Sequence, residues 1–73
     1  MNTQCNMSRE GILSNFEKGL ASEKRAMDLC TELLTLVENE DDKEDLKKII
    51  IDETRHIKIT ENLISIVNND YLG

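Results

Sequence analysis

Three ionisable residues in this chain have the types and the spacing to bind a metal ion. Glu53 and His56 form a Glu-x-x-His motif, and Glu23 lies 30 residues before Glu53. Side chains three apart on a helix share one face, so the motif can hold an ion from one side. Carboxylate oxygens bridge metals well, and neutral imidazole suits iron, zinc, nickel and copper. These residues predict a metal site, provided that the fold brings Glu23 to the motif.

Two long segments repeat apolar residues at alternating spacings of three and four. On the first segment this row consists of Leu13, Phe16, Leu20, Glu23, Met27, Cys30, Leu34 and Val37. On the second it consists of Leu46, Ile49, Glu53, His56, Thr60, Leu63 and Val67, flanked by Ile50, Ile57 and Ile64. Such spacing predicts two helices that pack along a coiled-coil-like seam. The three candidate ligands are therefore expected on the core faces of the helices.

The ends of the two predicted helices are marked by polar residues. We expect a disordered tail over 1–7, a helix over about 8–38 with Ser8 as its N-cap, and a loop over about 39–42. The second helix is expected over about 42–68, with Asp41 and Glu44 as its capping pair, and 71–73 as a short stub. Because the loop is short, the sequence predicts an all-α, antiparallel two-helix hairpin.

The register of this hairpin brings the candidate ligands to one level. If the turn centres near residue 40, Glu23 lies level with residue 57. Glu53 and His56 then lie within about 6 Å of Glu23 along the helix axis, at about 1.5 Å per residue. All three side chains can reach one layer of the core.

A second copy of the hairpin would complete both the core and the site. A lone hairpin offers three ligands and leaves much of its apolar seam in water, whereas two-fold association makes a four-helix bundle with four Glu and two His. Four carboxylates balance the charge of two divalent ions, so the ligand layer becomes neutral. This neutrality favours two metal ions per dimer.

Each candidate ligand also has a simpler interpretation when it is taken alone. His56 could be a hydrogen-bonded core or interface histidine, Glu23 could set the register of the seam, and Glu53 could reach solvent. Thr60 could support a ligand or merely be tolerated in the seam. The three ionisable residues at one depth favour metal binding over these readings, because a buried charge without a partner is costly.

Composition excludes several classes of partner. The 73 residues carry a formal net charge of -6, which argues against nucleic acids and anionic membranes as partners. The longest aliphatic run is Ile49–Ile51, far short of a membrane span, and the first ten residues lack the apolar stretch of a secretory signal. A cytoplasmic location is expected.

Cys5 and Cys30 are too few for a disulfide framework and are expected to be free thiols.

Over about residues 16–67 the sequence resembles the encapsulated ferritins, two-helix members of the ferritin-like, rubrerythrin-related superfamily. The resemblance rests on the segment from Ile51 to His56, on the separation of Glu23 from Glu53, and on their placement in the seams. Ferritin-like di-iron proteins use one Glu from each of two helices and Glu-x-x-His from each of the other two. An aromatic pair that is common in the family is replaced here by Leu29 and Cys30.

The resemblance implies a ferroxidase that oxidises Fe(II) to Fe(III) with dioxygen, for iron storage or detoxification. Glu23, Glu53 and His56 would bind the metal and carry the reaction, with two iron ions per dimer shared across the subunit interface. It further implies a homodimer, a ring of dimers such as a decamer, and residence inside an encapsulin shell. The family's C-terminal helix and shell-targeting tail are not found in these residues.

Two other functions fit the same residues. One is a non-catalytic module, in which the hairpin binds another metal such as zinc, or none, and serves only oligomerisation. The other is a peroxide reductase in the manner of rubrerythrins, although those proteins usually carry an additional carboxylate and a four-cysteine domain. Metal content per chain separates the first alternative, and turnover with peroxide against dioxygen separates the second.

Overall fold

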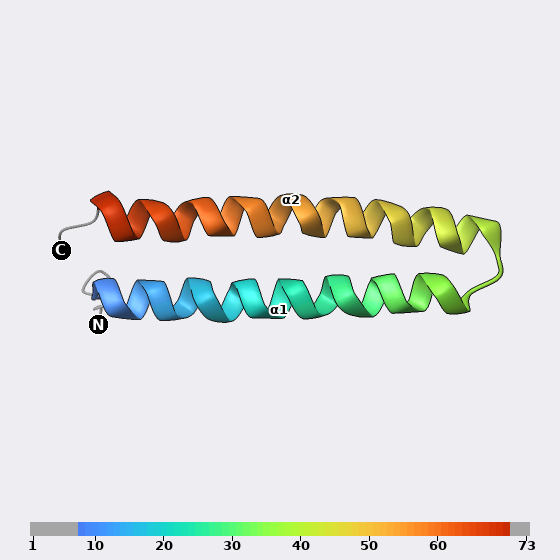
Figure 1. Ribbon diagram of the computed structural model, residues 1–73, viewed down its shortest axis with the longest axis horizontal. Coiled ribbons are helices and arrows are strands. Elements are labelled where there is room, and N and C mark those ends of the chain that lie inside the picture. The colour runs from blue at the N-terminus through green and yellow to red at the C-terminus, as the bar shows by residue number, and fades with distance from the viewer. Residues whose placement is uncertain (1–7, 71–73) are drawn as a thin grey trace, which may run out of the picture.

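A computed structural model of the chain describes residues 8–70, which form two antiparallel helices joined by a short loop (Figure 1). Helix α1 spans Arg9–Leu36 and helix α2 spans Glu40–Asp70. The pair measures 50 × 27 × 14 Å. The all-α hairpin predicted from the sequence is therefore confirmed, while the expected tail over 1–7 and stub over 71–73 lie outside the described residues.

Local capping explains where α1 begins. The hydroxyl of Ser8 accepts a hydrogen bond from the backbone N–H of Gly11 at 3.0 Å, and Glu10 lies in the first turn. Both features compensate the unpaired N–H groups and the positive end of the helix dipole. The predicted N-cap at Ser8 is confirmed. At the other end of α1, the N–H of Val37 still donates to the carbonyl of Leu33 at 3.1 Å.

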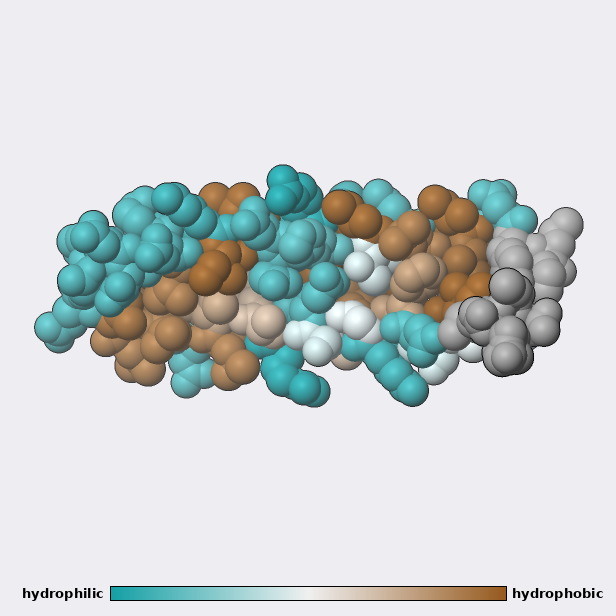
Figure 2. Space-filling view, turned by 180° about the vertical axis from the view of Figure 1, so that it is seen from behind, coloured by the Kyte–Doolittle hydropathy of each residue, from teal (hydrophilic) through white to brown (hydrophobic). Residues whose placement is uncertain are grey.

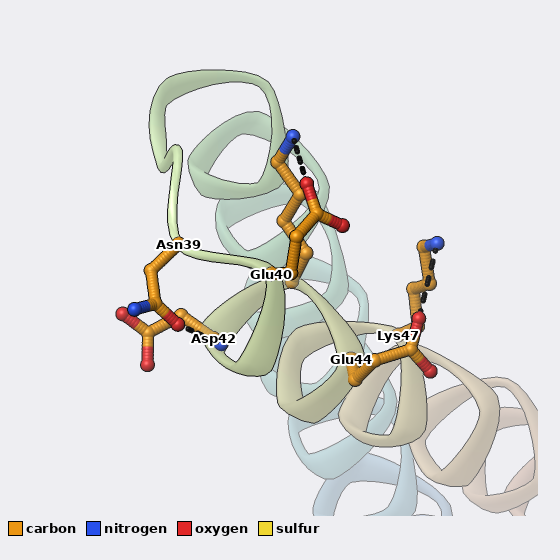
Figure 3. A network of polar contacts seen from close by, with 6 residues as sticks. Asn39, Glu40, Asp42, Glu44 and Lys47 are labelled. Atoms are coloured by element: carbon orange, nitrogen blue, oxygen red, sulfur yellow. Dashed lines mark hydrogen bonds and ion pairs between the residues drawn. The ribbon is translucent and has the colours of Figure 1, made fainter.

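The loop lies earlier than the sequence pattern indicated, at residues 37–39 instead of about 39–42. Asn39, and not Asp41, caps α2, because its side-chain Oδ1 accepts from the N–H of Asp42 at 3.0 Å (Figure 3). Glu40, Asp41 and Asp42 then form an acidic first turn, where the helix dipole favours negative charge. Glu40 and Asp41 are thus part of the helix that they were expected to precede.

The interface between the helices is long and only partly closed. Within residues 8–70, only Leu46 and Val67 are buried, one near each end of α2. All eight residues of the predicted α1 seam are half-buried. Two side-chain contacts fix the register near the middle: the Thr60 hydroxyl bonds Glu23, and the Thr54 hydroxyl lies 3.3 Å from Sδ of Met27.

The seam on α2 is rotated from the one predicted. Ile50, Ile57 and Ile64, expected as a flank, are the half-buried residues that face α1 together with Leu46, Glu53, Thr60 and Val67. Ile49, His56 and Leu63, expected in the seam, are exposed instead. Both rows fit a spacing of three and four. Three isoleucines bury more apolar area than a row that contains an imidazole, so the isoleucine row packs inward.

The exposed row belongs to a broad apolar face on one side of the hairpin. This apolar face consists of Ile12, Gly19, Ala26, Leu29, Leu33 and Leu36 of α1 and Ile49, His56, Ile59, Leu63 and Ile66 of α2. Figure 2 shows apolar side chains over α1 near the loop and over α2 towards its C-terminal end, with polar residues between. The opposite edge of the seam is polar and carries Glu17, Lys24, Thr31, Lys47, Thr54 and Glu61.

Candidate metal site

The described residues contain one group of side chains that could hold a metal ion, and it is the group predicted from the sequence. Glu23 from α1 and Glu53 and His56 from α2 each offer one ligand atom, and these atoms all lie within 4.8 Å of one another. Ligands on opposite sides of one ion lie about 4.2 Å apart, since metal–nitrogen and metal–oxygen bonds are about 2.1 Å. Small side-chain movements would bring the three atoms onto a common ion.

Glu23 is held in place by a residue from the other helix. Oγ1 of Thr60 donates a hydrogen bond to Oε1 of Glu23 at 3.1 Å, in a partly buried setting. The second carboxylate oxygen, Oε2, faces Nδ1 of His56 at 3.9 Å. That distance is too long for a hydrogen bond. One oxygen of Glu23 is therefore anchored, and the other is left for a ligand.

Glu53 contributes an oxygen with no partner. Its Oε1 is buried, and no hydrogen-bond donor among the described residues reaches it. A buried acceptor without a donor costs about 1–3 kcal/mol, and more when the group is charged. A cation at the centre of the cluster would satisfy this oxygen.

His56 differs from the sequence prediction in its environment. It was expected on the core face, but its side chain is 49 % exposed, compared with 29 % for Glu23. It stands on the apolar face between Ile49 and Leu63, seven residues away on either side. The cluster is therefore open on that side, and the imidazole is its outermost member.

Thr60 is the member of the site whose role the sequence left open. The signal was present, because Thr60 is a polar residue in a row whose members other than the candidate ligands are isoleucine, leucine and valine, and it lies four residues after His56. Its bond to Glu23 also confirms the predicted register, since residues 56 and 60 bracket the expected level of residue 57. Of the cysteines, Cys30 is a half-buried free thiol, and Cys5 lies outside the described residues.

Comparison with known proteins adds no relative. No family model matches this sequence, and no curated protein or solved structure matches it either. The resemblance to the encapsulated ferritins therefore rests on the motif, its spacing and the hairpin alone. No helix among residues 8–70 is long and apolar enough to cross a membrane.

Proposed function

We propose that two copies of this hairpin join through their apolar faces, bind two Fe(II) ions at the Glu23, Glu53 and His56 cluster, and oxidise them with dioxygen. The observation that carries this proposal is the cluster itself: three ligand atoms within 4.8 Å, one of them from a residue whose Oε1 is buried without a partner. Structural polar residues normally satisfy one another, whereas here the buried Oε1 of Glu53 has no donor among the described residues, and a cation would satisfy it.

The exposure of the hairpin supports the dimer. Among residues 8–70, eight large apolar side chains are exposed, including Leu36 and Ile51, each at 68 %. Most of them lie on the apolar face, next to the cluster. Three protein ligands leave several coordination positions open on an iron ion, and a second copy would supply the same three residues again. Four carboxylates and two imidazoles would then surround two ions.

The chemistry requires two electrons per dioxygen. Each of two Fe(II) ions loses one electron, and dioxygen takes both electrons with two protons from water to give hydrogen peroxide and two Fe(III). Iron is the substrate, and the protein's task is to hold two ions close enough to react with one dioxygen. Carboxylates suit this task because they favour the higher charge of Fe(III).

The test begins with binding and then adds air. Anaerobic titration of the metal-free protein with Fe(II) should saturate at one iron per chain, and admission of air should give rapid growth of absorbance in the near ultraviolet. Glu53→Ala and His56→Ala should lower the initial rate at least tenfold, whereas Glu61→Ala, on the polar edge, should leave it unchanged. A Glu53→Ala variant that oxidises iron as fast as the parent defeats the proposal.

A second candidate function is a non-catalytic oligomerisation module, and the extent of the apolar face favours it. If the protein is such a module, it contains zinc or no metal when purified without chelator, and it remains a stable dimer. Elemental analysis combined with native mass spectrometry separates the two functions. The same iron assay with peroxide in place of dioxygen tests the rubrerythrin-like alternative. The ring of dimers, the encapsulin shell and the cytoplasmic location stay predictions.

A further inference from the structure

The apolar face has a different make-up in its two halves. Along α1, the half near the loop presents Leu29, Leu33 and Leu36, all exposed. The half near the N-terminus presents Asn15, Gly19 and Ser22, which lie fourteen residues before Leu29, Leu33 and Leu36 respectively and so on the same rows of the helix. One half of α1 therefore projects three large side chains, and the other half, apart from Ile12, is a shallow row of small and polar ones.

Gly19 is the shallowest point of that row. A Cβ built on it would meet no atom within 4 Å. Glycine in the middle of a helix is unfavourable relative to alanine, and nothing within the hairpin requires it here. A helix from another chain could approach closely at this position.

The charge of the hairpin is also uneven. Residues 31–48 carry seven acidic and three basic side chains, so -4 of the total charge of -6 lies at the loop end. Asp42 and Asp45 line a groove there together with Leu33, Val37 and Leu46. Two hairpins joined with their loop ends together would bring both acidic groups side by side. Like charges repel over the Debye length of about 10 Å, so the head-to-tail orientation is favoured.

The metal site fixes where the two-fold axis must pass. In this hairpin, residues at the same level have numbers that sum to about 80, as the contacts of Met27 with Thr54 and of Glu23 with His56 show. Glu53 and His56 therefore lie level with residues 27 and 24 of α1. Together with Glu23 on α1 itself, these levels place the centre of the cluster near residue 25. An axis that joins two clusters in the head-to-tail orientation sets α1 against its copy about that level. With the axis at residue 26, one residue from that centre, Leu33 and Gly19 lie seven residues to either side of it and face each other.

We infer that the partner on the apolar face is a second copy arranged head to tail, with Leu33 of each chain seated over Gly19 of the other. This inference rests on the proposed dimeric site and goes further, because it specifies the orientation and a contact. Large side chains of one α1 enter the row of small side chains on the other, which is the packing of ridges into grooves. The acidic loops lie at opposite ends of the bundle.

Spin labels measure the orientation directly. Glu38→Cys, in a chain with Cys5→Ser and Cys30→Ser, places one label in the loop of each copy. The head-to-tail dimer should give a distance of about 40 Å, since each loop lies 12 residues from the axis at about 1.5 Å per residue. Loop ends joined together should give less than about 25 Å, and that result overturns the inference. Arg25→Cys, near the axis, should give a short distance and shows that the labelled protein is dimeric.

The Leu33–Gly19 contact is tested by dissociation of the dimer on dilution. Gly19→Leu should raise the dimer dissociation constant at least tenfold, and Leu33→Ala added to it should recover most of that loss. Ala21→Leu, on the other side of the same helix, is the matched control and should change little. If Gly19→Leu weakens the dimer no more than Ala21→Leu does, the contact is wrong. Iron stoichiometry, measured on the same samples, reports separately on whether the proposed metal site exists.

Discussion

The middle of the helix interface and its two ends are built from different residues. Near the ends, Leu46 and Val67 are buried against α1. In the middle, the seam contains Glu23, Glu53 and Thr60, which are only half-buried. The ends close the hairpin by apolar contact, while the middle interrupts this contact with two carboxylates and a hydroxyl.

The contrast between apolar ends and a polar middle separates the residues that stabilise the hairpin from those that serve its function. An apolar side chain at position 53 would extend the packing without the cost of an unpaired buried oxygen. The chain instead keeps Glu53 there, with Glu23 anchored by Thr60 beside it. Polar residues that lower stability in one layer of a largely apolar interface are typical of a functional site.

The largest loss of stability is expected from a substitution at one end of the helix interface. Leu46→Ala should lower the free energy of unfolding by about 2–4 kcal/mol, because it removes a buried leucine from the interface. Chemical denaturation followed by circular dichroism, at one fixed protein concentration, measures the change. Ile51→Ala is the control, since Ile51 is 68 % exposed. Equal losses from both substitutions would mean that the ends do not hold the hairpin together.

The next largest change in stability is expected from metal binding in the middle of the helix interface. An ion that binds only the folded protein, at a concentration 100 times its dissociation constant, stabilises that protein by about 2.7 kcal/mol. Thermal melts with and without Fe(II) under nitrogen should show this shift, and a chelator should reverse it. His56→Ala should abolish the shift while its metal-free melting temperature stays close to the parent's, because His56 is on the exposed side of the cluster.

A substitution at Glu53 would make the middle of the helix interface apolar, like its ends. Glu53→Leu should raise the stability of the metal-free protein by about 1–2 kcal/mol, since it replaces a buried oxygen without a donor by apolar surface. The same variant should no longer be stabilised by Fe(II). Glu61→Leu, on the polar edge, is the matched control. If Glu53→Leu destabilises the metal-free protein, the carboxylate supports the fold and the contrast between middle and ends does not hold.

The sequence was sufficient for the fold and for the membership of the cluster. Residues such as Leu13, Phe16 and Leu20 recur at helical spacing, and the short loop forces the helices to be antiparallel neighbours. The arithmetic of the loop then places Glu23 level with the Glu-x-x-His motif. These features depend only on residue order and helix geometry, so they can be derived from the sequence.

The rotation of α2 and the exact loop could not be derived in this way. The rows through Ile49 and through Ile50 both combine with Leu46 and Glu53 at spacings of three and four, so periodicity alone does not choose between them. Packing against α1 determines which of the two rows faces inward. Because the row through Ile50 does, His56 is exposed. At the loop, Asn39 and Asp41 are both good N-caps, and only the backbone path shows that Asn39 accepts the hydrogen bond.

The smallest change in stability is expected at the loop end, where Asn39 caps α2. Asn39→Ala should lower the free energy of unfolding by about 1 kcal/mol, because the N–H of Asp42 loses its acceptor. Asp41→Ala should cost less, since its carboxylate contributes only through the helix dipole. Neither substitution should change iron binding, because both lie far along the helices from the cluster. A loss of iron affinity in Asn39→Ala would show that the loop end and the middle are coupled, and the two regions would then have to be treated as one cooperative unit.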